Sequence, residues 1–91
     1  MIDAIDRFVL ALAEAVDALQ DAYSASDCTR LDRLARDLAT DAESLGYAPL
    51  AQLAEDVASC AVREKQEEAR VVLEDLTAIA QRIRMGHRGA I

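Results

Sequence analysis

The feature that most constrains this chain is the return of apolar residues at three- and four-residue steps over four long segments. Spacing of this kind places apolar side chains on one stripe of an α-helix and polar side chains on the other. Only three glycines and one proline occur in 91 residues, so few positions interrupt a helix. The sequence therefore predicts an all-α fold with almost no strand.

Each of the four predicted helices carries one apolar stripe. The first helix starts near Ile2, and its stripe is Ile5, Phe8, Val9, Leu12, Val16, Leu19 and Tyr23. The second stripe is Leu31, Leu34, Ala35, Leu38, Ala42 and Leu45. The third is Leu50, Leu53, Ala54, Val57, Cys60 and Ala61, and the fourth is Ala69, Val72, Leu73, Leu76, Ile79, Ala80 and Ile83. Because four such helices can cover one another's apolar faces, we expect an up-down-up-down four-helix bundle.

The links between the predicted helices carry end signals. Ser26 or Asp27 can cap the second helix by accepting a hydrogen bond from its free N–H groups. Gly46 suits the left-handed position after that helix, and Pro49 suits the first turn of the third. The third link is the least defined, because residues 63–68 contain no glycine or proline. The loss of every apolar side chain over those residues predicts the turn there.

We expect one domain over residues 1–86, closed by Gly86, and a flexible tail over residues 87–91. The net charge of −7 disfavours nucleic acid and anionic membrane surfaces as partners. No apolar run approaches the roughly 18 residues of a membrane span, and the acidic start of the chain is unlike a signal peptide. These features predict a cytoplasmic protein.

Little in the sequence points to catalysis or metal binding. Cys28 and Cys60 are expected to be free thiols, with Cys60 buried and inert. His87 is the only histidine, and we expect it to be a surface residue of the tail rather than a nucleophile. No cysteine or histidine spacing of a metal site occurs. We therefore predict no catalytic residue, no metal ligand and no cofactor.

Residues 36–46 read R-D-L-A-T-D-A-E-S-L-G. This segment resembles the second helix of histidine phosphotransfer (HPt) domains, whose pattern is close to H-x-L-K-G-S-A-x-x-L-G. Leu38, Ala42 and the Leu45–Gly46 pair match its structural positions. The following YAPLAQLAEDV is similar to the family's third-helix entry, and the resemblance continues through the fourth helix. It implies an HPt-like four-helix bundle.

The diagnostic positions of that pattern are different here. Arg36 stands where the family has its phosphoaccepting histidine, and Ala39, Thr40 and Asp41 replace its usual lysine, glycine and serine. Phosphotransfer needs an imidazole nitrogen that is free to attack near neutral pH, whereas a guanidinium stays protonated. The resemblance therefore implies the fold without the transfer activity.

The position of Arg36 on the helix is informative. At about 100° per residue, Arg36 lies roughly 160° from Leu38, on the solvent side. Arg33, Thr40 and Glu43 share that side. We identify these four residues as the candidate partner-binding face.

Two interpretations of the basic residues on this face stay open. In the first, they form a solvated patch paired with Asp32, Asp37 or Asp41 at helical spacing. In the second, they dock a partner, because guanidinium groups bind carboxylates and phosphates bidentately. The resemblance makes a response-regulator receiver domain or a histidine kinase the expected partner.

The sequence thus favours a non-catalytic HPt-like interaction module in bacterial two-component signalling. The alternative is a structural helical bundle for dimerisation or scaffolding, unrelated to phosphorelay. An apolar residue off the core stripe, such as Leu10 or Val71, would then mark the interface, and a homodimer is open under either hypothesis. A working phosphotransferase is least favoured, because its nucleophile is missing.

Overall fold

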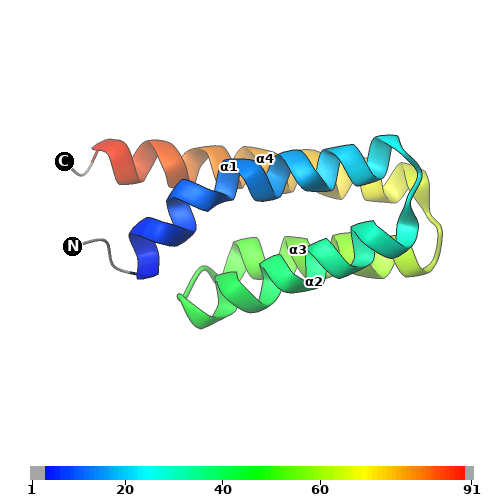
Figure 1. Cartoon of the computed structure of the whole chain (residues 1–91), viewed down its shortest axis with the longest axis horizontal. Coiled ribbons are helices and arrows are strands. Elements are labelled where there is room, and N and C mark those ends of the chain that lie inside the picture. Colours follow the sequence, from blue (N-terminus) through cyan, green and yellow to red (C-terminus); the bar gives the residue numbers. More distant parts are fainter. Residues whose placement is uncertain (1–3, 90–91) are drawn as a thin grey trace.

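A computed structural model of the chain describes the backbone of residues 4–89 and the side chains of residues 6–86. It contains four helices, α1 (Ala4–Ser24), α2 (Cys28–Ser44), α3 (Ala48–Val62) and α4 (Gln66–Gly89). No strand occurs in the described range. The helices run alternately in opposite directions in a body of 40 × 20 × 19 Å (Figure 1). The predicted all-α four-helix bundle is confirmed.

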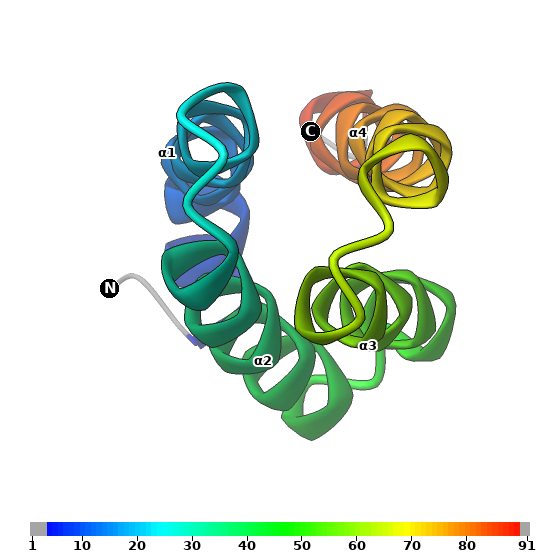
Figure 2. The same ribbon diagram turned by 90° about the vertical axis from the view of Figure 1, so that its right-hand side faces the viewer.

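The four helices form a closed ring. Each helix packs against the next in the chain, and α4 completes the ring by packing against α1 (Figure 2). The diagonal pairs, α1 with α3 and α2 with α4, make no close backbone contact over the described residues. The N-terminal turns of α1 lean away from α4 towards the turn between α2 and α3 (Figures 1 and 2).

The core lies along the axis of this ring and is apolar. Its largest fully buried side chains are Leu12, Leu19, Leu50, Val57 and Leu76. Among the described residues no polar or charged side chain is buried. The most extensive helix contact is between α2 and α3. Both helices also bury several alanines, and short side chains of this kind allow neighbouring backbones to approach closely. The alanines are Ala35, Ala39 and Ala42 in α2 and Ala51, Ala54 and Ala58 in α3.

The buried face of α3 is rotated from the predicted stripe. Ala51 and Ala58 are buried, whereas Leu53 and Cys60 are only half-buried. The prediction of a buried Cys60 is therefore wrong. The reason is that α3 packs against both α2 and α4, so two neighbouring helices set its buried arc, which includes Ala51 and Ala58.

The three links have the same backbone geometry. Each is three residues long, and its middle residue is left-handed, with φ of 56° at Ser26, 86° at Gly46 and 56° at Glu64. The next N–H then donates to the carbonyl five positions back, as in a Schellman motif. The donor and acceptor residues are Asp27 and Ala22, Tyr47 and Ala42, and Lys65 and Cys60, at 3.0, 2.9 and 2.9 Å.

The predicted end signals agree with these links in most places. Asp27 caps α2 by accepting a hydrogen bond from the Arg30 N–H at 3.1 Å. Gly46 takes the left-handed position, and Pro49 lies in the first turn of α3. The third turn falls within residues 63–68, as predicted, with Glu64 as its left-handed residue.

The predicted end of the last helix is wrong. Helix α4 continues through Gly86 to Gly89, because glycine permits a helix to end but does not force it to. The predicted flexible tail therefore overlaps the last helical turn, and its remainder, residues 90–91, lies outside the described residues. The predicted start of the first helix near Ile2, the side chain of Ile5 and the side chain of His87 also lie outside them.

Candidate functional site on helix α2

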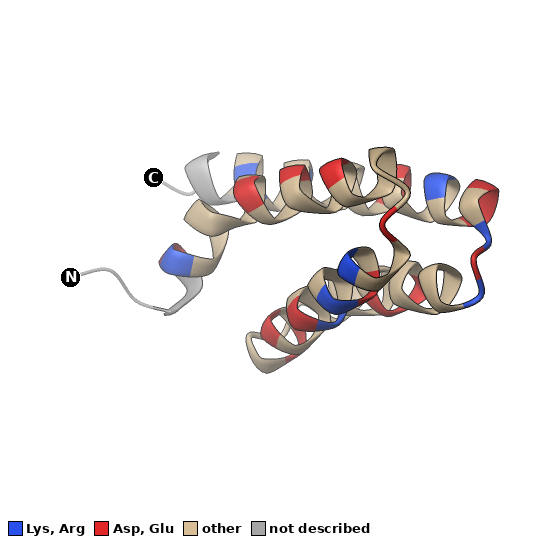
Figure 3. Ribbon diagram, turned by 45° about the vertical axis from the view of Figure 1, so that its right-hand side comes forward, with Lys and Arg blue, Asp and Glu red and all other residues tan. Residues whose placement is uncertain are grey.

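The four predicted partner-binding residues are all exposed on α2. Arg33, Arg36, Thr40 and Glu43 lie along the outer side of the helix, which confirms their predicted orientation. Figure 3 shows basic and acidic segments close together along α2. The face itself carries two arginines, one threonine and one glutamate, and the other acidic residues of α2 lie outside it.

Arg36 makes two hydrogen bonds to side chains within α2, one through its own side chain and one through its backbone carbonyl. Its Nε donates to Asp32 Oδ1 at 2.7 Å, and its carbonyl oxygen accepts a hydrogen bond from Thr40 Oγ1 at 3.1 Å. The two charged side chains are 63% and 27% exposed, so the pair stabilises the helix by only a few tenths of a kcal/mol. The Nη atoms of Arg36 make no hydrogen bond to any residue that the structure describes. The ion pair with Asp32 therefore orients the guanidinium through Nε and leaves its two Nη atoms able to donate to another acceptor.

Arg33 and Glu43 complete the face without ion pairs. No carboxylate of a described residue lies within ion-pairing distance of the Arg33 guanidinium, although Asp37 stands four residues further along α2. Of the three carboxylates considered for pairing, only Asp32 is engaged. The solvated-patch interpretation thus accounts for one arginine and leaves the second unpaired.

Two positions at which this chain departs from the HPt pattern, Ala39 and Asp41, differ from each other in burial. Ala39, where the HPt pattern has lysine, is only 4% exposed and belongs to the core. A lysine ammonium placed there would have to enter the apolar core or distort it. Asp41 is exposed and carries a carboxylate in place of the hydroxyl. The residues around Arg36 therefore differ in chemistry from those of the HPt pattern.

The cysteines lie at one end of the bundle. Cys28 and Cys60 are both free and half-buried, and both border a cavity of about 10 Å³, too small for a ligand. Gln66 Nε2 lies 3.8 Å from Cys28 Sγ. Burial, followed by the nearby charges of Glu68 and Asp56, raises the pKa of the Cys60 thiol. This proximity of two half-buried thiols was missed from the sequence, because 31 intervening residues give no sign of it.

Metal-binding clusters and membrane-spanning helices are absent from the described residues. No group of three or more His, Cys, Asp or Glu side chains in this range is placed to hold a metal ion. Within the same part of the chain, none of the helices combines the length and apolarity needed to cross a membrane.

No protein-family model, curated protein or solved structure matches the chain. The resemblance to HPt domains therefore rests only on the residues quoted for it.

Proposed function

We propose that this chain is a non-catalytic, HPt-like interaction module of two-component signalling that acts in the cytoplasm. It docks a receiver or histidine kinase domain through the exposed face of α2, formed by Arg33, Arg36, Thr40 and Glu43. The observation that carries the proposal is the guanidinium of Arg36, which Asp32 orients at 2.7 Å while its Nη atoms stay unpaired within the described structure. Such a group suits the carboxylates around a receiver's phosphorylatable aspartate.

The module binds without accepting phosphate. Arg36 occupies the acceptor position and its guanidinium is protonated at neutral pH, so it offers no nucleophilic nitrogen. Incubation with a phosphorylated receiver domain should leave no acid-labile phosphate on the chain. Acid-labile phosphate on the wild-type chain would contradict this part of the proposal.

The test of docking is a binding titration against receiver and histidine kinase domains from the same cell. Arg36→Glu and Arg33→Glu should each weaken binding about tenfold or more, because each reverses a charge that faces acidic groups of the partner. Arg82→Glu is the matched control, since Arg82 is exposed on α4 and has no ion pair in the described structure. Circular dichroism first establishes that each variant is folded.

Equal weakening by Arg82→Glu would assign the binding to overall charge and reject the α2 face. Failure to bind any receiver or kinase domain would reject the signalling role altogether.

A second candidate is a structural bundle that dimerises, and exposed apolar residues favour it. Leu10 and Val71, predicted to lie off the core stripes, are 67% and 46% exposed. Sedimentation equilibrium of the wild type and of Leu10→Ser distinguishes this function. A dimer that Leu10→Ser dissociates, together with no binding to receiver domains, would favour the structural bundle.

A further inference from the structure

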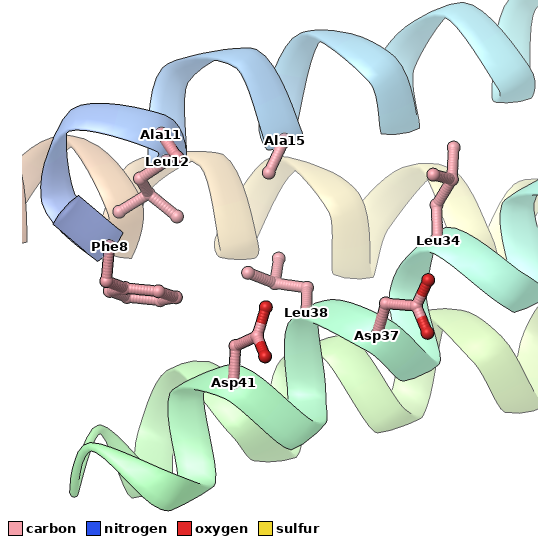
Figure 4. A pocket seen from close by; sticks show the side chains of 8 residues that line it. All are labelled: Phe8, Ala11, Leu12, Ala15, Leu34, Asp37, Leu38 and Asp41. Carbon is pink, nitrogen blue, oxygen red and sulfur yellow. The ribbon is translucent and has the colours of Figure 1, made fainter. Parts of the chain in front are cut away.

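A second surface lies on the flank of α2 that faces α1. A groove of about 140 Å³ runs between the two helices. Figure 4 shows Phe8 and Leu12 on its α1 side and Leu34, Leu38, Asp37 and Asp41 on its α2 side. Its floor is apolar and its edge on α2 is acidic.

The groove forms where short side chains of α1 lie opposite longer side chains of α2. Ala11 and Ala15 line it on α1, facing the α2 leucines, and they leave space that larger residues would fill. Phe8 forms one end of the groove, and its ring stacks on Tyr47 with the centroids 5.4 Å apart. This stacking fixes Phe8 where the first turns of α1 lean towards the link between α2 and α3 (Figure 1).

The volume decides what kind of occupant fits. Pockets for small-molecule ligands usually measure about 300–1,000 Å³, so a groove of about 140 Å³ is too small for a cofactor. It is large enough for a single apolar side chain. An amphipathic helix docks in a groove through apolar anchor side chains on one face, and this groove accommodates one such anchor.

The negative charge on the α2 edge of the groove determines which groups suit the positions beside the apolar anchor of a partner. Asp37 and Asp41 are one helical turn apart and exposed, and neither is in an ion pair within the described structure. In Figure 4 both carboxylates lie on the side of α2 that borders the groove. Carboxylates in this arrangement favour a cationic group next to the anchor. A second copy of this chain is a poor occupant, because each copy carries a net charge of −7.

We propose that the groove between α1 and α2 docks a basic amphipathic helix of a partner protein. An apolar side chain of that helix enters between Leu34, Leu38 and the alanines of α1. A lysine or arginine one turn along the partner lies against Asp37 and Asp41. This surface is separate from the Arg36 face, and the inference does not depend on the proposed signalling role.

The probe is a short fluorescein-labelled amphipathic helix made of leucine and lysine, titrated with the full chain and followed by fluorescence anisotropy. Two comparison peptides replace its leucines by serine or its lysines by glutamate. Ala15→Leu fills the groove, and Ala13→Leu, which borders a different depression between α1 and α4, is its matched control. The charge variant is Asp37→Lys/Asp41→Lys.

The control for the Asp37→Lys/Asp41→Lys variant is Glu14→Lys/Asp21→Lys, which changes the net charge by the same amount at exposed positions of α1. Ala15→Leu and the Asp37/Asp41 variant should each lose about tenfold or more in affinity, while both controls stay close to wild type. The serine and glutamate peptides should bind at least about tenfold more weakly than the leucine–lysine peptide.

Several results would overturn the proposal. Absence of binding by the leucine–lysine peptide would do so, as would equal binding by the serine peptide or equal losses in the control variants. Retention of full affinity by Ala15→Leu would show that the groove is not the site. A wild-type dimer that Ala15→Leu dissociates would assign the groove to a second copy instead. Arg36→Glu should not weaken peptide binding, so this test and the test of the Arg36 face can fail separately.

Discussion

The left-handed link between α2 and α3 allows a sharp test of what holds the turns in place. Gly46 has φ of +86°, and a Cβ added there meets no atom within 4 Å. Gly86, inside α4, also has open space around an added Cβ, but its backbone is helical. Gly46→Ala and Gly86→Ala are thus the same chemical change with no steric clash at either site. We expect them to change the free energy of unfolding in opposite directions.

The magnitudes follow from the backbone alone. A left-handed conformation costs a residue with a Cβ roughly 1–2 kcal/mol, so Gly46→Ala should lower the free energy of unfolding by about 1 kcal/mol. In a helix interior, alanine is better than glycine by about 0.8–1.0 kcal/mol. Gly86→Ala should therefore raise the free energy of unfolding. The increase should be somewhat smaller than the full helix-interior difference, because Gly86 lies in the last turn described for α4. Differences of this size shift the Tm of a domain this small by about 4–8 °C per kcal/mol.

The assay is urea unfolding followed by circular dichroism, with equal m-values as the condition for comparing midpoints. Ser26 and Glu64 provide a second set, since both are left-handed at φ of 56° without being glycine. Ser26→Gly and Glu64→Gly should stabilise the chain by about half a kcal/mol each, because relief of strain is partly offset by the greater freedom of glycine in the unfolded state.

A neutral or stabilising Gly46→Ala would refute the assignment of strain to this position. Destabilisation by Gly86→Ala to the same extent as by Gly46→Ala would refute the argument from φ, because it would make the loss of glycine itself the cause.

Three further changes test the core and the thiol. Ala39→Lys should cost more than about 2 kcal/mol, since it places a charge in the apolar core, whereas Ala78→Lys, exposed on α4, should stay within about 0.5 kcal/mol; equal urea midpoints would contradict the burial of Ala39. Leu19→Ala should cost about 2–5 kcal/mol, because this side chain is 0% exposed, and a loss in urea stability below about 1 kcal/mol would place it outside the core. The raised pKa of Cys60 lowers the thiolate fraction, so peptide mapping should show slower alkylation in the native than in the unfolded chain, with a rate that keeps rising at pH values where the unfolded thiol is already ionised. Glu68→Gln should speed native alkylation by removing a negative charge that raises this pKa, and an unchanged rate would exclude that charge as a cause.

The periodicity of apolar residues was enough to predict four helices and their order, because one helix face must be covered wherever such a stripe occurs. The end signals at Ser26 or Asp27 and at Gly46 were also readable, since capping and left-handed conformations depend on local chemistry. The structure assigns the cap to Asp27 and makes Ser26 the left-handed residue. Glu64 was not readable as the left-handed residue of the third link. Its conformation is imposed by the packing of α3 and α4 on either side of it, against its own preference.

The candidate face of α2 was predicted in orientation but not in detail. Helical angles alone placed Arg33 and Arg36 on the solvent side. Which carboxylate pairs with Arg36 depended on side-chain rotamers, and the structure selected Asp32 over Asp37 and Asp41.

What the sequence by itself determined is therefore local: the helices, most of their ends, and the outward direction of the arginines. The tertiary structure decided what depends on two helices at once. The burial of Ala39 depends on the helices packed against α2, and the groove beside Asp37 follows from the alanines of α1 that face the leucines of α2. An apolar stripe on one helix predicts that this face is covered by another helix. How closely the two helices pack depends on which helix covers the face and on the lengths of its side chains, and both are known only from the tertiary structure.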